Sequence, residues 1–228
     1  MTTLLIATRN AHKVGEIRAI LGEGFRYLTL QEFPAAPNVV EDADTFTGNA
    51  MKKATELARW LGKTRNSELG TRNLFVLADD SGLEVDALDG KPGVHSARFA
   101  ALDSGQPGNS TDADNNAKLL RVLKDIPLEK RMARFRCVLA LAPVIAERTE
   151  SASPVCYLDE FELQTTLFEG TCEGRIDLSP RGQGGFGYDP LFVPHGHDQS
   201  FAELGEDVKN QISHRARALA GLKSALMR

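Results

Sequence analysis

The chain has 228 residues, of which 42% are hydrophobic and 25% are charged, and this composition is that of an ordinary globular protein. Its formal net charge of −4 excludes the basic surplus that is typical of nucleic-acid-binding proteins, although a local basic patch can still bind phosphates. The length suits one large domain or two lobes that share a sheet.

Neither the cysteines nor the apolar runs indicate a secreted or membrane protein. The three cysteines are odd in number and lack CxxC spacing, which argues against a disulfide framework or a zinc site. The first residues contain no basic segment and too short an apolar run for a signal peptide. The longest apolar stretch, 137–146, contains Pro143 and is too short to span a bilayer. We therefore expect a cytoplasmic protein with reduced thiols and no membrane partner.

The first part of the chain alternates between strands and helices. The apolar run 4–7 predicts a strand, and the helix that follows has Asn10 as its N-cap and ends at Gly22. A second strand is expected at 26–30. The apolar spacing over 47–61 then predicts a long amphipathic helix.

Two strand-like runs, 74–79 and 82–88, come next, and they flank a pair of adjacent acids. We expect Asp79 and Asp80 where the first of these runs leaves the core. Two carboxylates there are costly unless they are paired or bind a metal. A structural turn with side-chain caps is the alternative. The pair is the clearest sign that the chain acts on something cationic or metal-bound.

The second part of the chain contains longer strands. A polar loop is expected at 103–114, followed by a helix near 114–124 and a long strand at 132–146. Residues 155–172 resemble a hairpin, and a helix near 211–227 closes the chain. Early alternation followed by long strands predicts a mixed α/β sheet with helices packed on it.

The segment from Thr8 to Lys13 lies where the first strand meets the first helix. Helix N-termini offer backbone N–H groups and a partial positive charge that suit phosphate, and Lys13 adds a full charge. The segment is no Walker P-loop, because GxxxxGK is absent. An ordinary capped helix with a solvated lysine is the alternative.

Three charged residues elsewhere are candidates for a metal and phosphate site. Magnesium usually keeps several waters, so one or two carboxylates plus substrate phosphates suffice to bind it, and Asp80 and Glu41 are candidates. Glu41 is also typical of a surface acid. Lys53 flanks the apolar stripe of its helix, where we expect a lysine that extends its ammonium to solvent.

Two motifs near the C-terminus are candidates for binding a base. In the run from Gly184 to Pro190, glycines let backbone approach a ligand, and the aromatic Phe186 offers a face for stacking. A glycine-rich turn is the alternative. Arg215 lies along an apolar helical stripe, so it needs a partner, which can be a phosphate, a purine keto oxygen or an internal acid.

Together these motifs resemble the bacterial type of the inosine/xanthosine triphosphate pyrophosphatase family. In the family's order they are Thr8-x-Asn10-x-x-Lys13, Asp79-Asp80-Ser81-Gly82-Leu83, Pro92-Gly93-x-x-Ser96-Ala97-Arg98, Gly184-Gly185-Phe186-Gly187-Tyr188-Asp189-Pro190 and Ser213-His214-Arg215. Each motif is weak alone, but the set is highly specific and covers nearly the whole chain.

The resemblance implies a fold and an activity. The fold is an elongated two-lobed α/β domain over 1–228, with the nucleotide in a cleft between the lobes, in a homodimer. The activity is magnesium-dependent hydrolysis of dITP, ITP and XTP to the monophosphate and pyrophosphate, which cleanses the nucleotide pool. No nucleic-acid partner is implied.

The resemblance also implies residue roles. Asp80 is the proton acceptor, and Glu41 and Asp80 serve the magnesium. The implied substrate-binding residues are Thr8, Arg9, Asn10, Ala11, His12, Lys13, Lys53, Ser81, Phe186, Gly187, Tyr188, Asp189, Lys209, His214 and Arg215. Those up to Lys53 hold the triphosphate, Ser81 touches substrate, and those from Phe186 onward surround the base and sugar.

The chain departs from the family pattern in three places. Arg9 stands where many relatives carry glycine, and the loop 103–114 and the hairpin 148–170 are longer than in the compact bacterial form. Arg9 is expected to have little effect or to add one charge near the phosphates, whereas the two longer segments concern a lid or dimer contacts rather than the chemistry. The competing functions are a pyrophosphatase for other nucleotides, such as modified pyrimidine triphosphates, a nucleotide-binding regulator without turnover, and a nucleic-acid module.

Overall fold

The computed structural model describes residues 1–64, 73–103, 105, 108–145 and 164–227. Most of the hairpin expected at 148–170, part of the loop expected at 103–114, and Cys156 lie outside these residues. The strands are β1 (Thr2–Ile6), β2 (Phe25–Thr29), β3 (Leu74–Val85), β4 (Met132–Pro143), β5 (Thr166–Ile176) and β6 (Phe192–Pro194). The longer helices are α1 (Ala11–Leu21), α2 (Phe46–Lys63), α3 (Asp112–Val122), α5 (Phe201–Ile212) and α6 (His214–Leu226).

The strands form one six-stranded sheet in the order β2-β1-β3-β4-β5-β6. The predicted mixed α/β sheet with helices is therefore confirmed. The chain divides into two compact units. The first unit contains Met1–Asp80, Val138–Phe168 and Leu222–Arg228, and the second contains Ser81–Cys137 and Glu169–Gly221. Strands β3 and β4 each contribute residues to both units.

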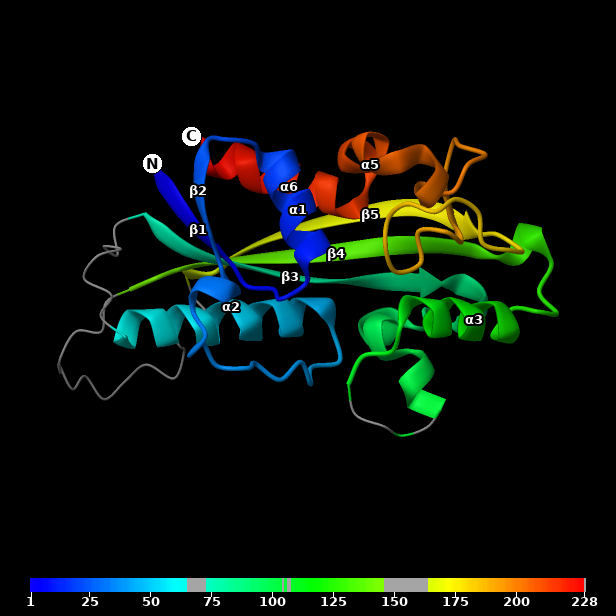
Figure 1. The fold of residues 1–228 in the computed structure, drawn as a ribbon, viewed down its shortest axis with the longest axis horizontal. Coiled ribbons are helices and arrows are strands. Elements are labelled where there is room, and N and C mark those ends of the chain that lie inside the picture. Colours follow the sequence, from blue (N-terminus) through cyan, green and yellow to red (C-terminus); the bar gives the residue numbers. More distant parts are fainter. Residues whose placement is uncertain (65–72, 104, 106–107, 146–163, 228) are drawn as a thin grey trace. The chain divides into compact units, whose positions relative to one another are not determined.

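The first unit is built on parallel pairing, since β1 pairs in parallel with both β2 and β3. The crossover from β1 to β2 and that from β2 to β3 run in opposite directions across the sheet. Because such crossovers are right-handed, their helices fall on opposite faces, and Figure 1 shows α1 and α2 on opposite sides of these strands. Leu5, Ile17 and Leu57 contribute to the core between the layers.

Helix α1 begins and ends as its sequence predicts. The Asn10 side chain accepts hydrogen bonds from the backbone N–H groups of His12 and Lys13, at 2.9 and 3.2 Å. At the other end Gly22 has φ +76°, a left-handed conformation that glycine adopts without strain.

Strand β3 corrects the prediction of two separate strands. The run 74–79 and the first part of the run 82–88 belong to one strand that continues through Asp79 and Asp80 and ends at Val85, after which 86–88 form a short 3-10 helix. The two acids lie in its middle, exposed by only 2% and 7%. The expectation that they mark the end of a strand is therefore wrong. The strand can continue through the two acids because lysines from other elements balance their charge. Local sequence does not reveal those lysines.

The second unit has an aromatic core. The ring of Phe192 lies 4.7 Å from that of Phe135 and 5.3 Å from that of Phe201, measured between centroids. The helix predicted near 211–227 is present as α6, and Ser213 separates it from a preceding helix, α5. Helix α5 is absent from the sequence prediction because Gly205, with φ +78°, interrupts its helical period.

No helix in the described ranges combines the length and the apolar character that crossing a bilayer requires.

Candidate active site

The acid pair on β3 is held by lysines from two helices of the first unit. The Lys13 ammonium, from α1, forms an ion pair with the Asp79 carboxylate. Asp79 is almost fully buried, so without this cation its charge would be strongly destabilising. Lys13 was expected to contact phosphate. A lysine has three donors, so the pairing with Asp79 leaves room for that contact.

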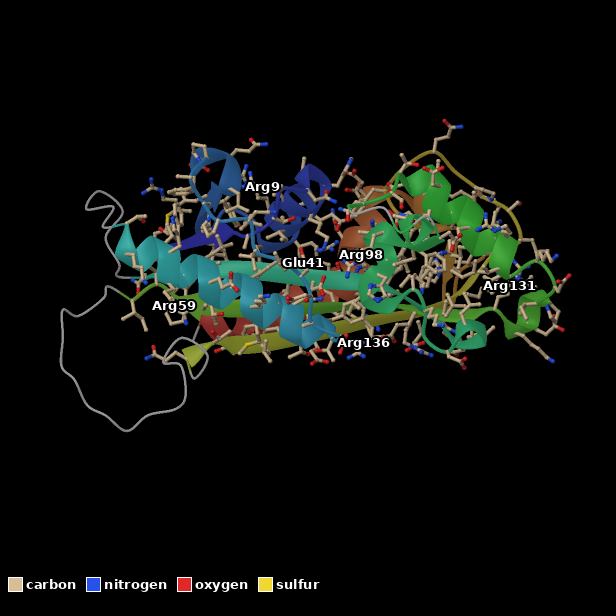
Figure 2. All side chains as sticks on the ribbon, turned by 90° about the horizontal axis from the view of Figure 1, so that it is seen from below. Arg9, Glu41, Arg59, Arg98, Arg131 and Arg136 are labelled. Atoms are coloured by element: carbon tan, nitrogen blue, oxygen red, sulfur yellow. The ribbon has the colours of Figure 1, made fainter. Side chains whose placement is uncertain are left out.

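Lys53 is the centre of this cluster. Its ammonium donates to the Asp79 backbone carbonyl at 2.6 Å and to Glu41 Oε2 at 3.0 Å. It lies 3.9 Å from Asp80 Oδ1. The expectation of a solvent-extended lysine is wrong, because Lys53 is only 9% exposed and its ammonium lies within 3.9 Å of three acceptor oxygens. Figure 2 labels Glu41, which precedes α2 and lies alongside β3.

Asp80 has an environment that changes its acidity. Its pKa is raised from the ordinary 3.8 to about 6, chiefly because the carboxylate is buried and to a lesser degree because Glu41 lies nearby. Lys53 and Lys13 act in the opposite direction, as does the hydrogen bond from Asn49. The Asn49 amide donates to Asp80 Oδ2 at 3.1 Å. Burial is the largest of these influences, so the carboxylate is a stronger base than usual.

Asn49 was missed by the sequence analysis. Its side chain also accepts from the Ala43 backbone N–H at 2.9 Å, which ties the segment before α2 to the helix. Asn49 and Lys53 are four residues apart on α2, so both face β3. The sequence signal that could have identified Asn49 and Lys53 is their four-residue spacing as polar residues on the apolar stripe of the helix.

The carboxylates of Glu41 and Asp80 fit a magnesium-type cation. Their oxygens lie 3.0 and 3.9 Å from the same Lys53 nitrogen, so they are separated by no more than the total of these distances, 6.9 Å. One ion can therefore bind one carboxylate directly and the other through a coordinated water. Within the described residues, no group of three or more potential ligands forms a closed metal cage. An open site of this kind suits a cation that also binds substrate phosphates.

The Thr8–Lys13 segment surrounds the N-terminus of α1. Asn10 already binds the amides of His12 and Lys13, and its own N–H donates to Thr8 Oγ1 at 3.2 Å. Arg9 and Ala11 are exposed. The positive end of the helix dipole and the lysine lie on the same segment, which is the arrangement expected for an anion site.

The second unit contains a separate polar cluster. The Lys209 ammonium lies 2.5 Å from Asp189 Oδ2 and 4.3 Å from the centroid of the Phe186 ring. The same Asp189 oxygen accepts from the Phe186 backbone N–H at 2.9 Å. The carboxylate therefore orders both the lysine and the loop that carries the aromatic ring.

Arg215 is buried in the second unit, as its place on the apolar stripe requires. It is 1% exposed, and its Nη2 donates to Ser81 Oγ at 2.9 Å. The neighbouring His214 stacks on Phe135 with ring centroids 4.8 Å apart. The Tyr188 hydroxyl donates to the Ser96 carbonyl at 2.9 Å, which attaches the glycine-rich loop to the segment before α3.

The structure thus gathers the predicted residues into two clusters, one in each unit. Lys13, Glu41, Lys53 and Asp80 are brought together in the first unit. Ser81, with the residues from Phe186 to Arg215, belongs to the second unit. Asp80 and Ser81 are consecutive residues of β3, so the two clusters are joined by one peptide bond.

These features define a class of α/β proteins in which a central strand of a mixed sheet carries buried carboxylates held by helical lysines. The comparison with known families gives a specific assignment. The chain belongs to the Ham1 family, whose model matches residues 4–225.

Similar proteins come from several bacteria. A dITP/XTP pyrophosphatase from Geobacter sulfurreducens is 47% identical over 99% of this chain and 97% of that protein. One from Geobacillus kaustophilus is 44% identical over 97% of this chain and 93% of that protein. The family resemblance inferred from the motifs is therefore confirmed.

Solved structures agree with this assignment. A HAM1 protein from Coxiella burnetii has a TM-score of 0.76 and 34% identity, covering 100% of this chain and 99% of that one. A nucleoside-triphosphatase / dITP/XTP pyrophosphatase from Mycobacterium abscessus has a TM-score of 0.65 and 38% identity, covering 97% of this chain and 98% of that one.

Proposed function

We propose that this chain hydrolyses dITP, ITP and XTP to the nucleoside monophosphate and pyrophosphate, and so removes these nucleotides from the cellular pool. The observation that carries the proposal is the buried Asp80 carboxylate, in the middle of β3, between Lys53 and Asn49. The names of the similar proteins from Geobacter sulfurreducens and Geobacillus kaustophilus support the choice of substrates.

Asp80 accepts the proton of the water that attacks the α-phosphorus. A general base works best when its pKa is near the working pH, and burial raises the pKa of Asp80 to about 6. At neutral pH the carboxylate is mostly ionised, so it can take a proton. The bond that breaks joins the α-phosphorus to the bridging oxygen, and pyrophosphate leaves with that oxygen.

The lysines and the α1 segment bind the triphosphate. Lys13 and Lys53 offset the negative charge that develops on the leaving pyrophosphate. The backbone and side chains from Thr8 to His12 complete the anion site at the positive end of the helix dipole. Asp79 holds Lys13 in place through its ion pair.

Glu41 and Asp80 would hold a magnesium ion. When bound, such an ion neutralises phosphate oxygens and lowers the pKa of a coordinated water. The Asn49 amide donates to one oxygen of Asp80 and so orients the carboxylate.

The second-unit cluster recognises the base. Arg215, Lys209 and protonated His214 are donors, and donors favour the keto oxygen at C6 of hypoxanthine and xanthine. Adenine carries an amino donor there, which would leave the buried donors unpaired, so it is rejected. Phe186 offers a flat face for stacking, and Ser81 contacts the substrate next to Asp80. We also propose, from the family resemblance, a cytoplasmic homodimer without nucleic-acid or membrane partners.

The test is a turnover panel with dITP, XTP, dGTP, ATP and a modified pyrimidine triphosphate, with and without magnesium, counting pyrophosphate against orthophosphate. We expect magnesium-dependent release of pyrophosphate from dITP and XTP, and much slower turnover of ATP. An Asp80→Asn preparation controls for contaminating phosphatases. Binding without turnover, orthophosphate as the main product, or preference for the pyrimidine would overturn the proposal.

A further inference from the structure

Helix α3 holds both polar atoms of Gly187 in the glycine-rich loop of the second unit. Asp112 Oδ2 accepts from the Gly187 backbone N–H at 2.7 Å. The Asn116 side-chain amide donates to the Gly187 carbonyl oxygen at 2.8 Å. Asp112 and Asn116 are four residues apart, so they lie one turn apart on the same face of the helix.

The backbone that these two residues hold has an unusual conformation. Gly187 has φ +63° and Gly185 has φ +75°, both in the left-handed region that glycine adopts most easily. A Cβ at Gly185 would lie 2.2 Å from Asp189 Oδ2, so that carboxylate packs directly against the loop. Because glycine has access to many backbone conformations, hydrogen bonds from neighbouring residues are needed to select this one.

The hydrogen bonds lie on either side of Phe186. The Phe186 N–H is bound by Asp189 Oδ2 at 2.9 Å, and the next N–H, that of Gly187, is bound by Asp112. Two consecutive backbone N–H groups are thus each held by a carboxylate. Hydrogen bonds to a charged acceptor are stronger than those to a neutral one, so the Phe186 backbone, and with it the direction of the Cα–Cβ bond, is held from both sides.

The two neighbouring asparagines of α3 differ in a way that points to a positioning role. Asn116 is only 9% exposed, and its Oδ1 has no hydrogen-bond partner among the described residues. Asn115 uses both ends of its amide, accepting from Ala100 N–H at 2.9 Å and donating to the Ala97 carbonyl at 3.2 Å. A buried acceptor without a partner opposes folding, so the hydrogen bond to Gly187 is the main contribution of Asn116.

We propose that Asp112 and Asn116 are positioning residues for base recognition, which hold the Phe186–Gly187 backbone so that the aromatic ring is presented to the purine. The inference rests on the proposed function, because it takes Phe186 as part of the base site. The two residues act through the loop and do not touch the triphosphate. Their loss therefore weakens binding of the base without weakening binding of the phosphates.

The experiment compares binding of two products, IMP and magnesium pyrophosphate, by isothermal titration calorimetry. The test variants are Asp112→Ala and Asn116→Ala. Asp114→Ala removes the same charge from the same turn of α3, and Asn115→Ala removes a buried amide that binds a different segment. Asp112→Asn is the conservative variant, since its side-chain oxygen can still accept from Gly187.

We expect Kd for IMP to rise about five- to tenfold in both test variants, the size expected for one lost hydrogen bond in this setting. Kd for pyrophosphate should stay within about twofold, and Asp112→Asn should restore most of the IMP affinity. Both controls should keep the wild-type ratio of the two affinities, even if Asn115→Ala melts at a lower temperature.

An unchanged ratio in the test variants would overturn the inference, as would an equal change in Asn115→Ala. If the wild-type chain turns over dITP but the test variants keep their IMP affinity, only this inference is overturned. A wild-type chain that neither turns over dITP nor binds IMP overturns the proposed function with it.

Discussion

The two clusters both bury a carboxylate beside a lysine, yet they use the acid differently. Asp80 has side-chain partners from the other elements of the first unit, and burial raises its pKa. Asp189 binds a backbone N–H and the Lys209 ammonium on a single oxygen, so its role is to order a loop. The comparison shows that a buried acid can be suited either to proton transfer or to ordering a loop. The partners of its carboxylate oxygens distinguish the two cases.

The strongest test of the chemical role is Asp80→Asn. The amide keeps the shape and can accept from Asn49, but it cannot take a proton, so we expect kcat for dITP to fall by two to four orders of magnitude. Nucleotide binding should persist. Steady-state kinetics with calorimetry of IMP binding would check this, and near-normal turnover would show that Asp80 is not the base.

The same substitution, Asp80→Asn, tests the raised pKa of Asp80 through the free energy of unfolding. The folded-state pKa of Asp80, about 6, lies above the ordinary 3.8, so ionisation of this group opposes folding. The penalty is absent below pH 3.8, grows as the pH rises toward 6, and is complete above it. Metal-free Asp80→Asn should therefore be more stable at pH 7.5 by up to about 3 kcal/mol.

Denaturant unfolding of both proteins in EDTA, at pH 7.5 and at the lowest pH where they remain folded, would measure this effect. The difference should shrink toward low pH. A variant that is less stable than wild type at pH 7.5 would mean that the surrounding lysines favour the Asp80 charge more than burial opposes it.

Removal of the Lys53 ammonium, which lies near both Glu41 and Asp80, should shift the pH profile of kcat/KM. Lys53 lowers the pKa of Asp80, so Lys53→Met raises that pKa further and moves the acid limb of kcat/KM to higher pH, by about one unit. At pH 7 we expect a loss of about tenfold or more, since phosphate binding is lost as well. Lys52→Met, which breaks the surface pair with Asp42, is the matched control. An acid limb that stays at the same pH in Lys53→Met would show that Lys53 does not control the pKa of Asp80.

The second cluster should respond in KM and selectivity rather than in kcat. If Arg215 donates to the keto oxygen as proposed, Arg215→Ala should raise KM for ITP by about tenfold and reduce the preference for ITP over ATP. Arg217→Ala, an exposed neighbour on α6, is the control. Arg215→Lys keeps the charge and guards against loss of folding. Unchanged discrimination in both Arg215 variants would contradict the assigned role.

Local signals in the sequence predicted much of the fold. The helix after Asn10 and its end at Gly22 followed from capping residues, and the period of the apolar residues predicted α2. The continuity of β3 did not follow, because its acids interrupt the apolar pattern and their lysines come from distant segments. Helix α5 was missed because Gly205 breaks the period.

The candidate site was predicted as a set of motifs, but its contacts were not. Neither the pairing of Lys13 with Asp79 nor the position of Lys53 follows from spacing along the chain, because each joins residues more than twenty positions apart. Asn49, Asp112 and Asn116 carry no motif of their own. They are recognised only when hydrogen bonds to Asp80 and Gly187 are seen.

The position of the acids in β3 has a consequence for synthesis on the ribosome. Lys13, Glu41, Asn49 and Lys53 all precede Asp79 in the chain, so these four residues of the acid cluster have been made before the acid pair emerges. Arg215 is made 134 residues after its partner Ser81. The nascent polypeptide can thus neutralise the buried acid pair early, whereas the contact between Arg215 and Ser81 waits for translation to near completion.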